Sequence, residues 1–201
     1  MTNTAIFEGT NFQTLLTKEP LKGAAIFCQG SNSMLFERNG RLYRLTLEGC
    51  GHNFLTQQWT QGNRNVVEVI HDYGAVAPSD SSLPGSEKEF YWLAEVERLV
   101  SVDEHSEPVL VRVIFELYDD NDELPDNAVL SKRCRSLANE QPALAGILRT
   151  LAEAADFAET HEGNVDAKLD NIMRRPITGE LVWADPLGGC FYELSPQKQK
   201  T

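Results

Sequence analysis

Four polar residues near the C-terminus have types and a spacing that suit phosphoryl-transfer chemistry. Asp166, Lys168 and Asn171 follow the spacing D-x-K-x-x-N, and Asp185 comes after the apolar run 181–183. A carboxylate can accept the proton of a hydroxyl group, and an ammonium group can offset charge on a phosphoryl group. Asp and Asn oxygens are ligands that suit Mg²⁺. The same spacing also occurs in solvated surface loops, where charged residues usually lie, and that alternative stays open.

The segment 164–186 resembles the catalytic loop and the metal-binding Asp of protein kinase-like proteins. The resemblance implies that Asp166 accepts the proton of the attacking hydroxyl and that Lys168 offsets charge on the moving phosphoryl group. It also implies that Asn171 and Asp185 hold Mg²⁺. Two departures are visible, because the family's His-Arg-Asp reads Asn-Val-Asp here and its Asp-Phe-Gly reads Asp-Pro-Leu.

The elements that must position these residues can be expected from hydrophobic periodicity and turn residues. Asn39-Gly40 between two apolar runs predicts a tight hairpin turn. The helix expected at 142–159 has apolar residues at three- and four-residue steps, as a helix with one buried face requires. Strands are expected at 24–28, 34–36, 42–47, 66–70, 91–95 and 181–183, and helices near 52–59, at 108–117 and at 142–159.

The turn 29–33 resembles a phosphate-covering loop that carries one glycine instead of three. The resemblance implies that Gly30, Ser31 and Ser33 bind ATP, since backbone N–H groups in such a turn can hold an anion. Arg44 stands at the strand position where the family has a Lys that contacts phosphates, and Arg is not a neutral exchange for Lys.

The acid that pairs with this strand cation in the family is missing from the next expected helix. Segment 52–59 contains no acidic residue, so an ion pair to Arg44 would have to come from Glu48 or Glu68. A hydrogen bond from Gln57 or Gln58 is the remaining alternative.

The predicted fold class is α+β, as a two-lobed protein kinase-like fold. Residues 1–97 are expected to form an N-lobe with an antiparallel β-sheet and one helix, and residues 98–201 a reduced helical C-lobe. In the order of its elements the chain resembles the compact protein kinase-like proteins of small tailed (podovirus) bacteriophages. The resemblance covers roughly residues 25–190, and its specific residues are concentrated in 164–186.

This resemblance implies an ATP-dependent serine/threonine protein kinase-like protein that uses Mg²⁺ and modifies host proteins. The alternative is a weak or inactive pseudokinase that binds and inhibits a host protein, which the Arg at position 44 and the missing acid favour. A small-molecule phosphotransferase and an acidic protein that occupies a basic groove of a host enzyme are further alternatives. The sequence gives no indication of the oligomeric state.

Composition limits the partners and the compartment. The chain has 201 residues and a formal net charge of -12, which disfavours nonspecific binding to nucleic acid or an anionic membrane. Its apolar runs are too short to cross a bilayer, so a cytoplasmic protein is expected, in the host cytoplasm if the gene is a phage gene. The four scattered cysteines predict neither a zinc site nor disulfides. The acidic run 119–123 lacks the glycine and terminal Glu of an EF-hand and is interpreted as a solvated loop.

Overall fold

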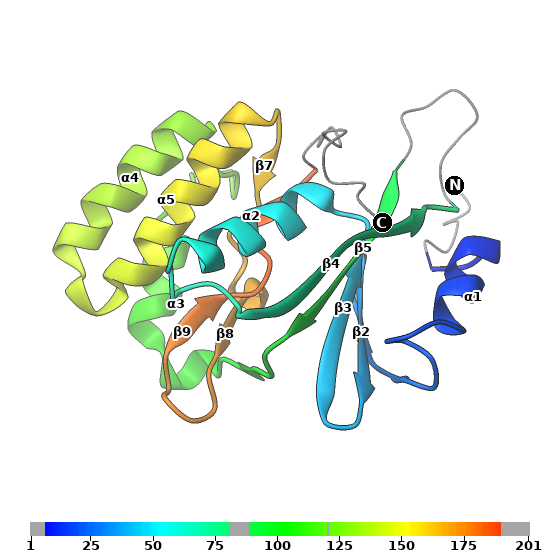
Figure 1. Ribbon diagram of the computed structural model, residues 1–201. Helices are drawn as coiled ribbons and strands as arrows, with labels where there is room; N and C mark the ends of the chain where they lie inside the picture. Colours follow the sequence, from blue (N-terminus) through cyan, green and yellow to red (C-terminus); the bar gives the residue numbers. More distant parts are fainter. Residues whose placement is uncertain (1–6, 81–88, 120, 190–201) are drawn as a thin grey trace.

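The computed structural model describes residues 7–80, 89–119 and 121–189. Within them, the first half of the chain forms a five-stranded antiparallel sheet with strand order β1-β2-β3-β5-β4 (Figure 1). The strands are β1 (Ala25–Gln29), β2 (Ser33–Arg38), β3 (Arg41–Thr46), β4 (Val69–Pro78) and β5 (Phe90–Val96). Strand β3 is therefore central in the sheet, with β2 on one side and β5 on the other.

The hairpin between β2 and β3 confirms the turn predicted at Asn39-Gly40. Both residues have positive φ, 51° at Asn39 and 78° at Gly40, and Arg38 pairs with Arg41 across the turn. A two-residue turn with this backbone is favoured by Asn and Gly, which adopt positive φ at low cost.

Five α-helices surround this sheet within the described residues. They are α1 (Thr10–Leu16), α2 (Gly49–Thr60), α3 (Pro108–Phe115), α4 (Asn127–Glu140) and α5 (Ala145–Thr160). Three short 3₁₀ segments are η1 (Glu104–Ser106), η2 (Pro142–Leu144) and η3 (Leu169–Asn171). Helices α4 and α5 lie side by side, and α2 lies between α5 and the sheet (Figure 1). The predicted α+β class is confirmed, whereas the division into lobes at residue 97 stays a prediction.

Two small sheets complete the second half of the chain. One has the strand order β6 (Val100–Ser101), β8 (Ile172–Arg174), β9 (Leu181–Trp183), and the other pairs β7 (Asn164–Val165) with β10 (Leu187–Gly188). Strand β9 matches the strand predicted at 181–183. Pairing of β7 with β10 brings the start of the D-x-K-x-x-N segment beside the residues that follow Asp185.

The main hydrophobic core joins the sheet to the helices. It includes Leu42 of β3, Phe54 of α2, Leu148 and Leu151 of α5 and Trp183 of β9, each at most 4% exposed. A second cluster on the opposite face of the sheet contains Phe12 and Leu15 of α1. The alternation along β3 explains both clusters, since successive strand residues point to opposite faces. No helix in the described part of the chain is long and apolar enough to span a bilayer.

Besides the short strands β6, β7, β8 and β10, two longer elements differ from the sequence expectation. The strand predicted at 66–70 begins only at Val69 and continues to Pro78, while Val66 forms an isolated parallel bridge with Trp183. Helix α4 was not predicted at all. Its buried residues include the polar Ser131 beside Leu130 and Cys134, so the apolar periodicity of this helix is weak.

Candidate active site

Arg44 and Asp185 form an ion pair that joins the central strand of the sheet to the segment after β9. Nη2 of Arg44 donates to Oδ2 of Asp185 at 2.8 Å, and the two side chains are 9% and 23% exposed. Arg44 shares a face of β3 with Leu42, which packs in the main core, so the strand aims this cation toward the helices. The expected partner from the helix after β3 is therefore replaced by Asp185. Gln58 bonds to Asn63 rather than to Arg44.

The second oxygen of Asp185 has no hydrogen-bond partner. Oδ1 is the one buried side-chain polar atom in the described part of the chain that lacks such a partner. A Cβ atom built on Gly51 would lie 3.2 Å from this oxygen, so the first turn of α2 packs closely against the carboxylate. A buried carboxylate oxygen without a donor is costly unless a cation or a proton donor meets it.

The D-x-K-x-x-N segment is fastened to the same place by backbone hydrogen bonds. The N–H of Asp166 donates to the carbonyl of Pro186 at 2.9 Å, and the N–H of Ala184 donates to the carbonyl of Asn171 at 2.8 Å. Ala184 and Pro186 are the residues directly before and after Asp185 in the sequence. The loop and the Asp therefore form one rigid unit.

Asn171 closes the loop from within. Its Nδ2 donates to the carbonyl of Asp166 at 3.0 Å, which leaves the amide Oδ1 available as an acceptor or metal ligand. Its own N–H donates to the carbonyl of Lys168 at 3.0 Å, in the η3 turn.

Asp166 and Lys168, predicted as base and charge partner, are paired with each other. Nζ of Lys168 lies 2.9 Å from Oδ1 of Asp166, and the side chains are 69% and 36% exposed. This hydrogen bond raises the pKa of the Lys168 ammonium. Both groups are open enough for a substrate to reach them.

The residues predicted to cover the phosphates lie in an exposed turn between β1 and β2. The N–H of Gly30 donates to the carbonyl of Ser33 at 2.8 Å, and Ser31 is exposed at the tip. No contact between Gly30, Ser31 or Ser33 and Arg44 or Asp185 is seen, so their role stays a prediction. The turn is connected to the site through a residue that the prediction omitted, Asn32.

Glu48, at the N-cap of α2, was predicted as a possible ion-pair partner of Arg44, but in the structure Arg44 pairs with Asp185 and Glu48 bonds to Asn32. Nδ2 of Asn32 donates to Oε1 of Glu48 at 2.7 Å, and the carbonyl of Asn32 accepts from the hydroxyl of Thr46 at 3.0 Å. Burial raises the pKa of the Glu48 carboxyl, and the charge of Asp185 raises it further.

The residues present fit a magnesium ion held partly by a nucleotide. In the described part of the chain no three His, Cys, Asp or Glu side chains gather as a self-sufficient metal site. Magnesium often takes only one or two protein oxygens and completes its shell with phosphate and water. Oδ1 of Asp185, which lacks a donor, and Oδ1 of Asn171 are suitable atoms for that purpose.

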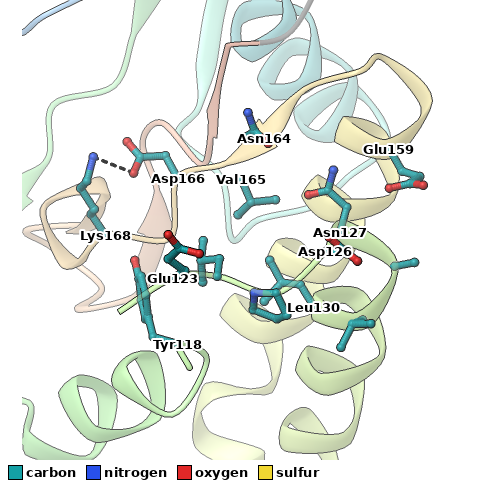
Figure 2. Close-up of a pocket in the computed structure, with 14 residues that line it drawn as sticks. Tyr118, Glu123, Asp126, Asn127, Leu130, Glu159, Asn164, Val165, Asp166 and Lys168 are labelled. Atoms are coloured by element: carbon teal, nitrogen blue, oxygen red, sulfur yellow. Dashed lines mark ion pairs between the residues drawn. The ribbon is translucent and has the colours of Figure 1, made fainter. Parts of the chain in front are cut away.

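A pocket of about 670 Å³ opens beside the loop, on the side of Asp166 and Lys168 (Figure 2). Its walls come from the end of the α3 region, the start of α4, the end of α5 and the loop. Arg44, Asn171 and Asp185 do not line it. The pocket therefore reaches Asp166 and Lys168 but not the ion pair of Arg44 and Asp185.

Comparisons with known proteins identify no family. No protein-family model matches the chain, and no curated protein matches it in sequence. Among solved structures, choline kinase LicA from Streptococcus pneumoniae is similar, with 12% sequence identity and a TM-score of 0.36. The match covers 86% of this chain and 66% of that chain, so this chain spans slightly less than two thirds of its length. A TM-score this low does not establish a shared fold.

Proposed function

We propose that the chain is an ATP-dependent phosphotransferase with a protein kinase-like fold and that its active site lies around Asp185. One observation carries the proposal. Asp185 receives Arg44 from the central strand, and the backbone on either side of it holds the loop of Asp166 and Asn171. Residue types that phosphoryl transfer requires thus converge from three separate segments.

In this proposal Asp166 is the general base. Its carboxylate accepts the proton of the acceptor hydroxyl while the hydroxyl oxygen forms a bond to the γ-phosphorus of ATP. The bond between that phosphorus and the bridging oxygen breaks, and ADP leaves with the electron pair. Lys168, 2.9 Å from Asp166, holds the carboxylate in position and places a positive charge beside the transferred group.

Asp185 and Asn171 are the residues that would hold magnesium, through their two Oδ1 atoms. Magnesium bound there would neutralise charge on the β- and γ-phosphates. Arg44 holds the Asp185 carboxylate through Oδ2, which leaves Oδ1 without a protein donor and available to a ligand. The remaining N–H groups of its guanidinium can donate to phosphate oxygens. In this proposal the turn of Gly30, Ser31 and Ser33 covers the phosphates, although the N–H of Gly30 is itself bonded to the carbonyl of Ser33.

A pseudokinase is the second candidate, and one observation favours it. The strand cation Arg44 is bound to Asp185 itself, and no acid of α2 pairs with it. A protein in which Arg44 stays bound to that carboxylate would bind nucleotide weakly, or would bind it without transferring its phosphate. A serine or threonine of a host protein as acceptor, the bacteriophage origin, and inhibition of a host partner stay predictions from the sequence resemblance.

Calorimetric titration with ATP, with and without Mg²⁺, tests the proposal directly. We expect magnesium-dependent binding in the native chain and its loss in Asp185→Ala. Asp170→Ala is the matched control, because Asp170 is an exposed carboxylate of the same loop, and it should bind ATP normally. An absence of ATP binding in the native chain overturns the proposal. If ATP binds, Arg44→Lys separates the two candidates, since it should raise transfer in a weak kinase and leave a pseudokinase inactive.

A further inference from the structure

The pocket beside the loop has the size and the position of a small-ligand site. Its volume of about 670 Å³ lies in the range of pockets that bind small molecules or a few residues of a peptide. Figure 2 shows Asp166 and Lys168 on one side of the pocket and Asn127 and Glu159 on the opposite side. A ligand in the pocket would therefore touch Asp166 but not Arg44 or Asp185, which do not line it.

Part of the wall is apolar and aromatic. Leu124 and Pro125 are half-buried and Val129 is 53% exposed, so these three side chains present apolar surface to the pocket. Tyr118 is half-buried, and its phenol group interacts electrostatically with both Asp166 and Lys168. An aromatic ring beside a carboxylate can bind an organic cation through the face of the ring.

The residues that line the pocket are mainly acidic. Glu123, Asp126 and Glu159 join Asp166 around the pocket, whereas Lys168 is its one basic residue and is already paired with Asp166. Glu123, Asp126 and Glu159 form no ion pair with any described residue. The field of these carboxylates repels anions and attracts cations, most strongly at low salt.

We propose that this pocket binds the phosphate acceptor and that the acceptor is an organic cation that carries a hydroxyl group. The inference rests on the proposed phosphotransfer at Asp166. The positive group lies among Glu123, Asp126 and Glu159, which orients the hydroxyl toward Asp166. The same chemistry is offered by a small amino alcohol and by a serine in an arginine-rich peptide.

Binding is measured first, without nucleotide, by calorimetry with two matched pairs of probes. Ethanolamine is compared with ethylene glycol, and a serine peptide flanked by arginines with the same peptide flanked by glutamines. We expect the cationic member of one pair to bind and its neutral match not to bind. The pair that shows the preference identifies the source of the acceptor.

Two triple variants with the same change in net charge then locate the site. Neutralising the pocket in Glu123→Gln/Asp126→Asn/Glu159→Gln should weaken cation binding by about two- to fivefold for each carboxylate. The control Glu104→Gln/Glu140→Gln/Glu153→Gln removes three exposed carboxylates outside the pocket and should leave binding unchanged. In transfer assays with ATP, the pocket variant should raise the KM for the cationic acceptor and leave the KM for ATP unchanged.

The outcomes separate this inference from the proposed function. Equal binding of charged and neutral probes, or equal weakening by both triple variants, overturns the cation pocket even if ATP binds normally. Cation binding in a chain that does not bind ATP overturns the acceptor role, because no phosphoryl donor would then reach Asp166.

Discussion

Arg44 and Asp185 are 141 residues apart in the chain, and their side chains meet at 2.8 Å. The contact is nearly enclosed, since the Arg44 side chain is only 9% exposed. An enclosed ion pair is sensitive to the loss of either member, because the remaining charge keeps its desolvation cost without its partner. The pair thus joins the sheet to the candidate active site through a hydrogen bond between opposite charges.

A double-mutant cycle should reveal this coupling. Arg44→Met and Asp185→Leu should each lower the free energy of unfolding by about 3 kcal/mol, since each leaves a buried charge unpaired. The double variant should lose about 1–3 kcal/mol less than the sum of the single losses. Urea denaturation measures all four proteins. Strictly additive losses would show that the two groups do not interact in solution.

Gly51 is expected to control the position of the Asp185 carboxylate. Alanine normally stabilises a helix by about 1 kcal/mol relative to glycine, but a Cβ here would lie 3.2 Å from Oδ1 of Asp185. Gly51→Ala should therefore weaken magnesium-dependent ATP binding by about tenfold, a loss of about 1.4 kcal/mol in binding, while the protein stays folded.

The matched control for this change is Gly188→Ala. A Cβ on Gly188 would meet no atom within 4 Å, and the residue lies three positions after Asp185. Its ATP affinity should equal that of the native chain, as measured by the same calorimetric titration. Equal affinities for both alanine variants would contradict the positioning role of Gly51.

Arg175 is expected to be a major stabilising contact between the two halves of the chain. Nη2 of Arg175 lies 2.8 Å from Oε1 of Glu97 and donates to the carbonyl of Val66 at 3.1 Å. Nη1 donates to the carbonyl of Arg64 at 2.7 Å. The side chain is 11% exposed, so Glu97 and these carbonyls would lose their partner in a largely enclosed place. Arg175→Ala should lower the free energy of unfolding by about 3 kcal/mol in urea denaturation.

A surface arginine provides the comparison for Arg175. Arg112 faces Glu116 one helical turn away at 3.6 Å, and both side chains are largely exposed. Its replacement by Ala should cost no more than about 0.5 kcal/mol, as exposed pairs of this kind usually do. Similar losses for Arg112→Ala and Arg175→Ala would show that the contacts of Arg175 are not specially stabilising.

The cysteines should differ in reactivity. Burial raises the pKa of the Cys134 thiol to about 12, so at pH 8 it is almost entirely protonated, and it is also inaccessible. Cys28 on β1 is exposed. Iodoacetamide should therefore alkylate Cys28 and leave Cys134 unmodified until the protein is unfolded. Peptide mapping by mass spectrometry resolves the two sites, and early modification of Cys134 in native protein would contradict its burial.

Local sequence patterns determined several elements of this fold. Asn39-Gly40 predicted its hairpin because positive φ is cheap for these two residues. The apolar periodicity of α5 was also sufficient, since this helix buries one continuous face, and so was the short apolar run of β9, in which the consecutive residues Val182 and Trp183 are both buried. The spacing of Asp166, Lys168 and Asn171 predicts a functional loop; the structure ties that loop to the neighbours of Asp185, and its function stays a prediction.

Other features follow only from the tertiary structure, because they depend on contacts between distant segments. The sequence placed Arg44 on its strand but could not show that Asp185 is its partner, since an ion pair leaves no local pattern. The sequence likewise could not show the hydrogen bond between Asn32 and Glu48, or the acidic pocket, because each is assembled from residues of separate elements. Helix α4 also follows from the tertiary structure, because it is stabilised by packing against α5 and has no strong apolar stripe of its own. Residue types and local spacing thus determined which chemistry was available, and long-range packing decided which of these groups meet.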